Sequence, residues 1–226
     1  MTFPGDDIVD FVRACGVPAE AADRLGDLSR LYRDLVSANR RTNLTRLTGE
    51  EEFWVKHVAD SLTLGRVCPG LGEHPWAVVD VGAGAGFPSL PLAWAYPSLR
   101  VTAVEVRQQK IAFLERQVEA LGLSNCRVVG RQAREAARLP GCRGRFDLVT
   151  ARAVSDAGTL IREGRGFLRP ENAGMAFYKT PDAVAREWHT AEREAGKFGF
   201  RLETSEPFEL PQGGGSRQFL LVSADS

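Results

Sequence analysis

Short apolar runs alternate with amphipathic segments through the chain from about residue 75 onward. Five of these runs have the length and composition of buried strands: residues 77–81, 101–106, 127–129, 146–150 and 175–178. The segments between them repeat their apolar residues at helical spacing. Strands that alternate with helices predict βαβ units and a parallel sheet.

The end of the chain has a different pattern, because two strand-like runs, residues 200–210 and 217–222, are separated only by the glycine-rich turn 212–216. This turn leaves no room for a crossover helix, so we expect the two strands to pair antiparallel. Five parallel strands and a terminal antiparallel hairpin predict a seven-stranded, Rossmann-like α/β sheet of the class I S-adenosylmethionine (SAM)-dependent methyltransferase type. A dinucleotide-binding fold would instead have six parallel strands.

The first 70 residues have a helical pattern. Apolar residues recur at helical spacing in segments 8–12 and 25–36, and a further helix is predicted to begin with a capping sequence near residue 50. We expect Asn43 to end or cap a helix through its side chain. The sequence therefore predicts a single methyltransferase domain, 1–226, with a helical N-terminal extension (1–70) and a SAM-binding α/β core (75–226).

The composition is that of a globular protein in a reducing aqueous compartment. The chain has 226 residues, 43% of them hydrophobic and 26% charged, which suffices for one core. No window is long and apolar enough to span a membrane, and residues 1–7 lack the features of a signal peptide. The four cysteines are far apart and few histidines accompany them. We therefore expect a cytoplasmic protein with free thiols and no metal.

The charge is balanced overall but unevenly distributed. The chain has 29 Lys and Arg against 29 Asp and Glu, which removes the simplest argument for nucleic-acid binding. However, segment 24–46 carries six Arg against two Asp, and segment 127–152 carries seven Arg against two acidic residues. Arginine suits phosphate and base edges, although genome composition is an alternative reason for its abundance. A neutral chain can thus present basic faces.

A glycine-rich turn follows the first predicted strand. Residues 78–88 read Val-Val-Asp-Val-Gly-Ala-Gly-Ala-Gly-Phe-Pro, and their glycines (Gly82, Gly84 and Gly86) allow a ligand to approach the backbone ahead of a helix N-terminus. Their G-x-G-x-G spacing differs from the G-x-G-x-x-G of dinucleotide-binding proteins. Asp80 would be unfavourable beside a pyrophosphate but suits a cofactor with an ammonium group and a sulfonium charge. SAM is such a cofactor.

Two further strand ends are expected to complete the cofactor site. Glu105 ends the second strand, where an acid can accept hydrogen bonds from ribose hydroxyls; the alternative is a solvated acid. Gln132, Ala133 and Arg134 follow the third strand and would edge the adenine pocket. Because this segment lacks the acid that often receives the adenine amino group, we expect backbone groups to contact the base.

The residues together resemble those of the bacterial small-subunit (16S) rRNA guanine-N7 methyltransferases, also called glucose-inhibited division protein B. The resemblance spans about residues 30–222. It depends on Asn-Leu-Thr at 43–45, His-Val-Ala-Asp-Ser at 57–61, the loop 80–88 that continues into Leu-Pro-Leu-Ala at 90–93, and Arg-Ala at 152–153.

The resemblance implies SAM contacts at Gly82, Phe87, Ala133, Arg134 and Arg152, with Glu105 at the ribose. It places conserved positive residues of the cleft at Lys179 and Arg217, and a histidine at His57. It also implies 16S rRNA, in the 530-loop region, or the small ribosomal subunit as partner; we expect a monomer. The sequence departs from the family at Arg134, where an acid is usual.

The cationic residues have alternative interpretations. We expect Arg152, Lys179 and Arg217 to contact phosphate and guanine, because Arg can donate two bonds to guanine. Each could instead pair with a surface acid. His57 could be a packed core residue, line the cofactor mouth or contact RNA, and the sequence does not decide among these roles.

The expected chemistry needs little from the protein beyond positioning. Guanine N7 is a lone-pair nucleophile with no proton to lose, so no general base is required, and the protein must mainly hold donor and acceptor in line. Residues 150–153 lack the Asn/Asp-Pro-Pro-Tyr motif of amino-group methylation. Neither Cys68 nor Cys142 is placed as a cytosine-C5 nucleophile would be.

Three alternatives remain open on the sequence alone. A methyltransferase for a small metabolite is favoured by the neutral net charge but opposed by the two Arg-rich segments. A nicotinamide-dependent oxidoreductase is disfavoured by the glycine spacing. A retained but inactive fold would bind SAM without turnover.

Overall fold

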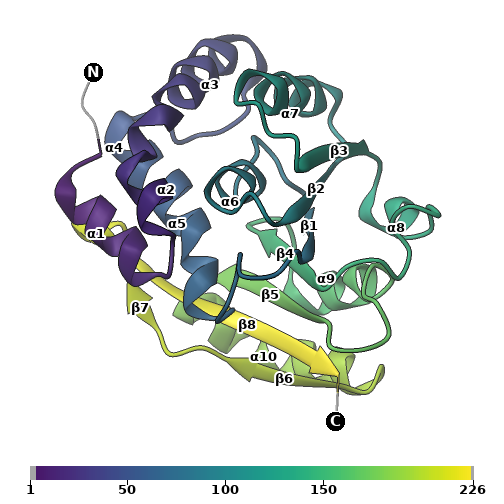
Figure 1. Cartoon of the computed structure of the whole chain (residues 1–226). Helices are drawn as coiled ribbons and strands as arrows, with labels where there is room; N and C mark the ends of the chain where they lie inside the picture. Colours follow the sequence, from purple (N-terminus) through teal and green to yellow (C-terminus); the bar gives the residue numbers. More distant parts are fainter. Residues whose placement is uncertain (1–3, 225–226) are drawn as a thin grey trace.

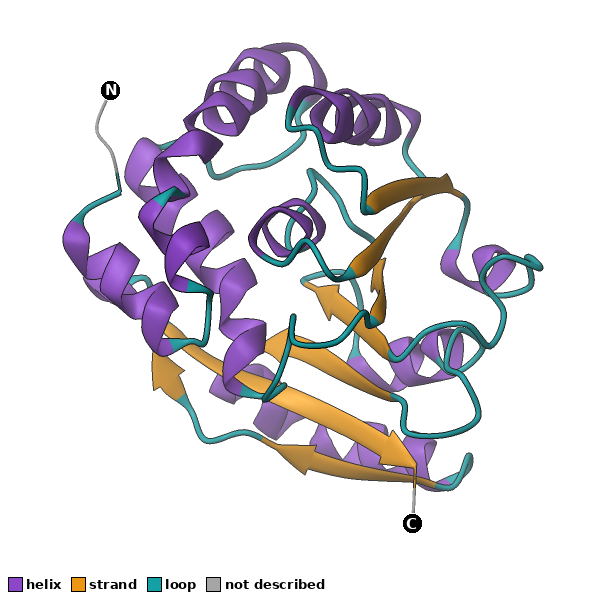
Figure 2. Ribbon diagram, viewed as in Figure 1, coloured by secondary structure: helices purple, strands orange, loops and turns teal. Residues whose placement is uncertain are grey.

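The computed structural model describes residues 4–224, so part of the N-terminal segment considered for a signal peptide lies outside the described residues (Figures 1 and 2). One mixed sheet has the order β3-β2-β1-β4-β5-β8-β6, with the short β7 paired to β8. Its strands are β1 (Ala77–Val81), β2 (Arg100–Glu105), β3 (Cys126–Gly130), β4 (Leu148–Arg152), β5 (Gly174–Lys179), β6 (Phe200–Thr204), β7 (Phe208–Glu209) and β8 (Ser216–Ala224).

The strand directions agree with the prediction. β1 to β5 pair parallel, whereas β8 lies antiparallel between β5 and β6. Seven strands therefore follow one another across the sheet, and its antiparallel part is formed by the last segment of the chain. This is the class I methyltransferase topology, and the α/β expectation is confirmed.

Most strand boundaries differ from the predicted ones by one or two residues, and two differences bear on the site. The run 200–210 is not one strand: β6 ends at Thr204 and β7 begins at Phe208. Pro207 lies between them and has no N–H to donate to a ladder. The fourth strand begins at Leu148 rather than at residue 146 and ends at Arg152. Because β4 extends to Arg152, the backbone of Arg152 pairs with Tyr178 of β5 within the sheet.

Helices cover both faces of the sheet (Figure 1). One face is covered by α6 (Ser89–Ala95) and α7 (Gln108–Ala120), and the other by α8 (Ala133–Ala136), α9 (Ala157–Gly164) and α10 (Pro181–Gly196). The caps of α9 and α10 are local: Asp156 Oδ1 accepts from Thr159 N at 2.9 Å, and Thr180 Oγ1 accepts from Ala183 N at 3.3 Å.

The N-terminal helices pack outside α6 and α7. They are α1 (Asp6–Ala14), α2 (Ala19–Asp23), the 3₁₀ turn η1 (Leu25–Leu28) and α3 (Ser29–Thr42). A continuous helical segment then passes through α4 (Glu50–Glu52), the π-helical η2 (Phe53–Ala59), α5 (Asp60–Leu62) and the 3₁₀ turn η3 (Thr63–Arg66). It begins near the predicted start, where Gly49 N donates to Glu52 Oε2 at 3.4 Å.

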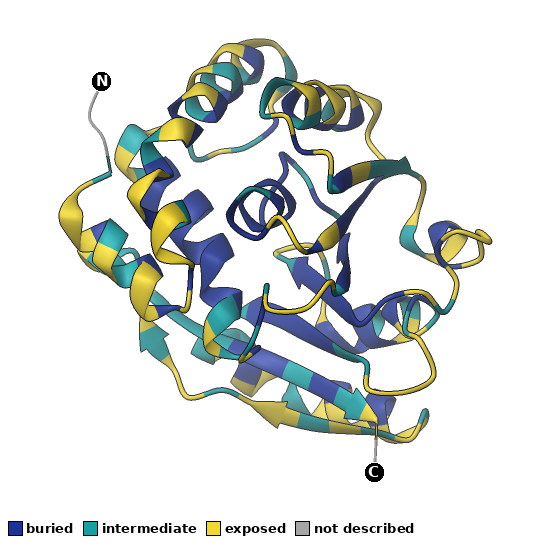
Figure 3. Cartoon of the chain, in the orientation of Figure 1, coloured by how far each residue is buried: buried dark blue, intermediate teal, exposed yellow. Residues whose placement is uncertain are grey.

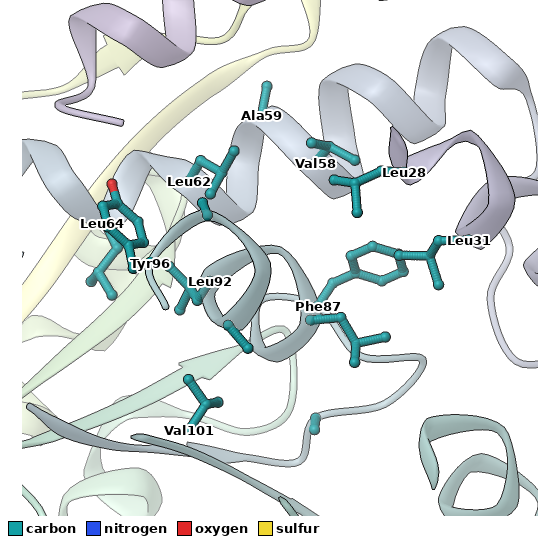
Figure 4. Packing of buried hydrophobic residues seen from close by; sticks show 14 of the residues in the cluster. Leu28, Leu31, Val58, Ala59, Leu62, Leu64, Phe87, Leu92, Tyr96 and Val101 are labelled. Carbon is teal, nitrogen blue, oxygen red and sulfur yellow. The ribbon is translucent and has the colours of Figure 1, made fainter. Parts of the chain in front are cut away.

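The N-terminal helices share one hydrophobic cluster with the sheet-covering helix α6. Figure 4 shows Leu28, Leu31 and Val58 of these helices in the same cluster as Phe87 and Leu92. Figure 3 shows the central strands and the inner helix faces as buried, whereas the outer helix faces and most of the edge strand β6 are exposed. Among residues 4–224, no helix is both long and apolar enough to cross a membrane.

Asn43 ends α3 by a mechanism different from the expected one. Its backbone is left-handed, with φ 45° and ψ 51°, and its N–H donates to Asn39 O at 3.3 Å. Asn tolerates this conformation better than most residues. Helix termination therefore follows from the backbone of Asn43 rather than from a side-chain cap, while the Asn39 side chain accepts from Thr45 N at 2.9 Å.

Candidate active site

The main cleft opens at the carboxyl ends of the parallel strands and has a volume of about 1440 Å³. Its walls include the glycine-rich loop after β1, Glu105 at the end of β2, Arg152 at the end of β4 and Lys179 at the end of β5. Residues 43–47 close it from the N-terminal side. Since the strand order reverses between β1 and β4, this is the position where open α/β sheets bind ligands.

The glycine-rich loop turns directly into the cleft. Gly82 has φ 73°, and both its N–H and that of Ala83 donate to Val104 O, at 2.9 and 3.0 Å. A Cβ at Gly82 would lie 2.6 Å from the Val154 side chain. Gly82 and Gly84 line the cleft, whereas Gly86 lies behind it against Leu90. The first two glycines therefore keep the cleft open, and the third allows α6 to pack closely.

Glu105 is buried at the cleft wall and holds two loops in place. Its Oε2 accepts from Gly84 N at 2.9 Å, and its Oε1 accepts from Val106 N and Arg107 N at 2.8 and 2.9 Å. The side chain is thus fixed between the glycine loop and the end of β2. A carboxylate has further lone pairs, so it can also accept from a ligand hydroxyl.

Asp80 lies beneath the glycine loop rather than in the cleft wall. It is 1% exposed, accepts a hydrogen bond from Ser89 Oγ, and lies 3.5 Å from Thr150 Oγ1. Burial raises the pKa of Asp80 to about 6. The described contacts therefore give Asp80 a role in joining β1, β4 and the start of α6, and they place it behind the surface that a cofactor would touch.

Two exposed apolar side chains line the cleft: Val106 follows β2, and Val154 follows β4 and lies against Gly82. Val106 and Val154 are 54% and 47% exposed, which is unusual for their type, and both line the cleft. Gln132 and Ala133 also line it, as expected for the end of the third strand. Arg134 is exposed and its side chain is not part of the wall, so the structure does not bring it together with the other predicted residues.

A buried carboxylate holds the two arginines of the cleft. Asp60 is 1% exposed; its Oδ2 accepts from Arg152 Nη1 at 2.9 Å and its Oδ1 from Arg217 Nε at 2.9 Å. Arg152 Nη1 also donates to Lys56 O at 2.7 Å. Charge-assisted bonds of this kind fix a planar guanidinium in direction as well as position. Two arginines distant in the sequence therefore lie side by side in one wall.

Sequence reasoning gave Asp60 no role, although it lies three residues after His57 in a segment that carries the family resemblance. A signal was present in the apolar stretch 53–62, because an acid on a buried helix face is almost always paired. Finding its partners required the tertiary fold: Arg152 and Arg217 come from β4 and β8.

His57 is a neutral, packed residue of the cleft. It is 5% exposed and stacks on Phe87 with ring centroids 4.3 Å apart. Its Nε2 lies 3.4 Å from Leu47 O, and its Nδ1 lies 3.4 Å from Arg152 Nη2. Burial, and then the charge of Arg152, lower the pKa of His57 to about 3. These contacts favour a role in packing the cleft wall over direct RNA contact.

Lys179 forms an ion pair with an acid, which was the alternative to a contact with RNA. The acid lies inside the cleft rather than on the outer surface. Lys179 Nζ donates to Glu187 Oε2 at 2.7 Å and to Ser155 O at 2.9 Å, and both partners line the cleft. Glu187 Oε2 also accepts from Ala157 N at 2.8 Å. The pair joins the end of β5 to the start of α9.

The glycine loop, the acid at the end of β2 and the cleft at the reversal of strand order define a class I SAM-dependent methyltransferase. Two solved structures share this fold: a SAM-dependent methyltransferase from Aquifex aeolicus (TM-score 0.58, 18% identity, covering 80% of this chain and 97% of that one) and Aeropyrum pernix fibrillarin with SAM (TM-score 0.56, 17% identity, 73% of each).

Sequence comparison shows the family. The model of the GidB family, rRNA small subunit methyltransferase G, matches residues 24–209, and the chain belongs to this family. The Ribosomal RNA small subunit methyltransferase G of Lacticaseibacillus paracasei is 37% identical over 192 residues, 84% of this chain and 78% of its own. That of Deinococcus deserti is 37% identical over 205 residues, 90% and 82% of the two chains.

Gly82→Asp is expected to abolish SAM binding, because it places a carboxylate and a strained backbone where the loop meets the cleft. Calorimetric titration should show affinity lower by about 100-fold or more, or roughly 3 kcal/mol. The matched control is Gly199→Asp, since Gly199 has φ 68° with open space around it. Equal affinity in the two variants would contradict the assignment of the loop.

Asp60→Asn is expected to lower the free energy of unfolding by about 3 kcal/mol, because it leaves two cleft arginines without their buried counter-charge. Urea unfolding measures this loss. Asp23→Asn, which breaks the exposed pair with Arg13, is the control and should leave the free energy of unfolding nearly unchanged, because solvent screens an exposed pair. Similar small losses in both variants would show that the Asp60 interaction contributes little.

His57 should make the protein less stable in mild acid. Its pKa is about 3 when folded and 6.5 at its reference value, so only the unfolded chain gains this proton as the pH falls below 6.5. Proton uptake by His57 in the unfolded chain should lower the free energy of unfolding by about 2 kcal/mol between pH 7 and pH 5. Asp80 acts in the opposite direction over part of this range, because its folded pKa is raised. The contribution of His57 is therefore measured by comparing the pH dependence of the free energy of unfolding in the wild type and in His57→Gln.

Urea unfolding of both proteins at pH 5 and pH 7 provides that comparison. The stability of His57→Gln relative to the wild type should rise by about 2 kcal/mol on going to pH 5. An identical pH dependence in the two proteins would mean that His57 titrates normally in the folded state.

Proposed function

We propose that this chain transfers a methyl group from SAM to N7 of a guanine in 16S rRNA, in the 530-loop region. The observation that carries the proposal is the cleft itself, where the glycine loop and Glu105 lie across from the Arg152–Asp60–Arg217 cluster. One wall has the features of a nucleoside site, and the other presents fixed cations.

The size and chemistry of the cleft fit a cofactor together with a second ligand. Pockets for one small molecule usually have volumes of about 300–1,000 Å³. The cleft has about 1440 Å³ and includes the backbone N–H-rich loop, a buried acid and the exposed apolar side chains Val106 and Val154. Gly82, Ala83, Glu105 and Ala133 would hold SAM, which leaves the arginine wall for the methyl acceptor.

SAM supplies the methyl group as a sulfonium electrophile, and the chain positions the acceptor. Arg152 and Arg217 can donate to the O6 edge or to a phosphate of a guanine nucleotide, since each guanidinium keeps N–H groups beyond those bound to Asp60. N7 has no proton to lose, so no residue needs to act as a base. The neutral, buried state of His57 agrees with this requirement.

The charge of the cleft favours RNA over a small neutral metabolite. Among the described residues that line it, eight are Lys or Arg and four are Asp or Glu. Arg40 and Arg41 lie exposed at the end of α3, next in the chain to the cleft residues 43–47. Because the N7 edge faces a groove of A-form RNA that side chains cannot enter, the target guanine is unpaired or flipped out when it binds.

The proposal extends to the setting of the reaction. The partner is 16S rRNA or the small ribosomal subunit, and the enzyme is a cytoplasmic, metal-independent monomer with a single methyltransferase domain. The four cysteines are free and buried, which agrees with a reducing compartment.

The direct test is transfer of labelled methyl from SAM to three substrates: unmethylated small subunits, their naked rRNA and a total metabolite extract. Aniline cleavage then detects N7-methylguanosine, and Gly82→Asp is the inactive control. Label at one cleavable guanosine in the 530 loop supports the proposal. Label only in the extract would replace RNA by a small substrate.

A further inference from the structure

A second recess lies at the opposite edge of the sheet from the cleft. It has a volume of about 610 Å³ and is lined at the amino ends of β1, β2 and β3 by Ala77, Arg100 and Cys126. Arg127 and Arg145 complete the set of cations in its wall. We call this site the basal recess. Nothing in the methyl-transfer reaction uses it.

The three arginines of the basal recess are exposed and retain free donors. Arg127 is fixed against the wall, because its Nε donates to Thr102 Oγ1 at 2.9 Å and its Nη2 to Gly141 O at 2.7 Å. Its Nη1 has no hydrogen bond to any described residue, and neither Arg100 nor Arg145 has a side-chain partner among residues 4–224. Several N–H donors therefore point to solvent around one hollow.

No acid compensates these charges. The described residues that line the basal recess include no Asp or Glu. The nearby Asp147 is occupied, since it accepts from Ala77 N at 2.6 Å and pairs with Arg169. Three uncompensated guanidinium groups in a concave site raise the local concentration of anions.

The remaining wall is mixed: Val101, Pro140 and Phe146 are apolar. Thr102, Ser124 and Asn125 add polar groups beside them. An arginine fork recognises a phosphate, and the exposed Pro140 offers apolar surface to the face of a base or sugar. The combination fits a nucleotide of a single-stranded RNA better than a free inorganic anion. We propose that the basal recess binds a phosphodiester and its nucleotide in a part of the RNA substrate that is not methylated.

This inference extends the proposed function, because it assigns a second contact on the same RNA. The two sites are separated by the length of β2, about 17 Å for the five steps from Arg100 to Glu105. A long substrate can reach both. Binding at two points raises the effective concentration of the target guanine at the cleft without any change in the cleft itself.

The double variant Arg100→Ala/Arg145→Ala tests the recess, with Arg193→Ala/Arg201→Ala as a control of equal charge change on the far side of the sheet. RNA binding is measured by filter retention of naked 16S rRNA over a range of salt. The recess variant should bind about tenfold more weakly at low salt, with the slope of log affinity against log salt reduced by about 0.7, the value for one phosphate of a single strand.

Unchanged affinity and slope relative to the control would overturn the proposal. It would also be overturned if binding to small subunits fell but binding to naked rRNA did not, because the recess would then contact a ribosomal protein. In methyl-transfer assays the variant should raise KM for rRNA about tenfold, with kcat and SAM affinity unchanged. RNA binding is measured without methyl transfer, so it tests the recess even if wild-type protein methylates no rRNA.

Discussion

The carboxylate of Asp60 is the point at which three distant parts of the chain meet. It lies in the helical N-terminal part and accepts hydrogen bonds from Arg152 on β4 and Arg217 on β8. Without this buried charge, two cations would remain partly desolvated beside each other at the sheet edge. The N-terminal helices therefore do more than cover α6, because they supply the counter-charge that fixes the arginine wall of the cleft.

The other wall depends on backbone geometry rather than on charge pairing. Gly82 turns with positive φ, and Glu105 accepts from three backbone N–H groups, which fixes the loop and the end of β2 together. The reaction proposed here needs two ligands held in line and no proton transfer. A rigid glycine loop facing oriented arginines meets this need, and neutral His57 packs between the two walls.

Local patterns allowed much of this to be predicted. Alternation of strands and helices, the glycine spacing and the acid after β2 are encoded in neighbouring residues, so the sheet topology and the position of the cleft followed from the sequence. Pairings between distant residues did not: Asp60 with Arg152 and Arg217, and Lys179 with Glu187, depend on the tertiary fold. The sequence also placed Asp80 and Arg134 near the cleft, but it could not show which way their side chains face. In the fold, neither side chain is part of the cleft wall.

In the proposed enzyme, one cleft holds the methyl donor at the glycine loop and the acceptor at the Asp60-oriented arginines. A crystal structure with S-adenosylhomocysteine and a short RNA bearing an unpaired guanine tests it most directly. The ribose is expected at Glu105, the adenine beside Val106, and the guanine within hydrogen-bond distance of Arg152 or Arg217. A nucleoside bound away from the glycine loop, or a guanine held without either arginine, would contradict this arrangement.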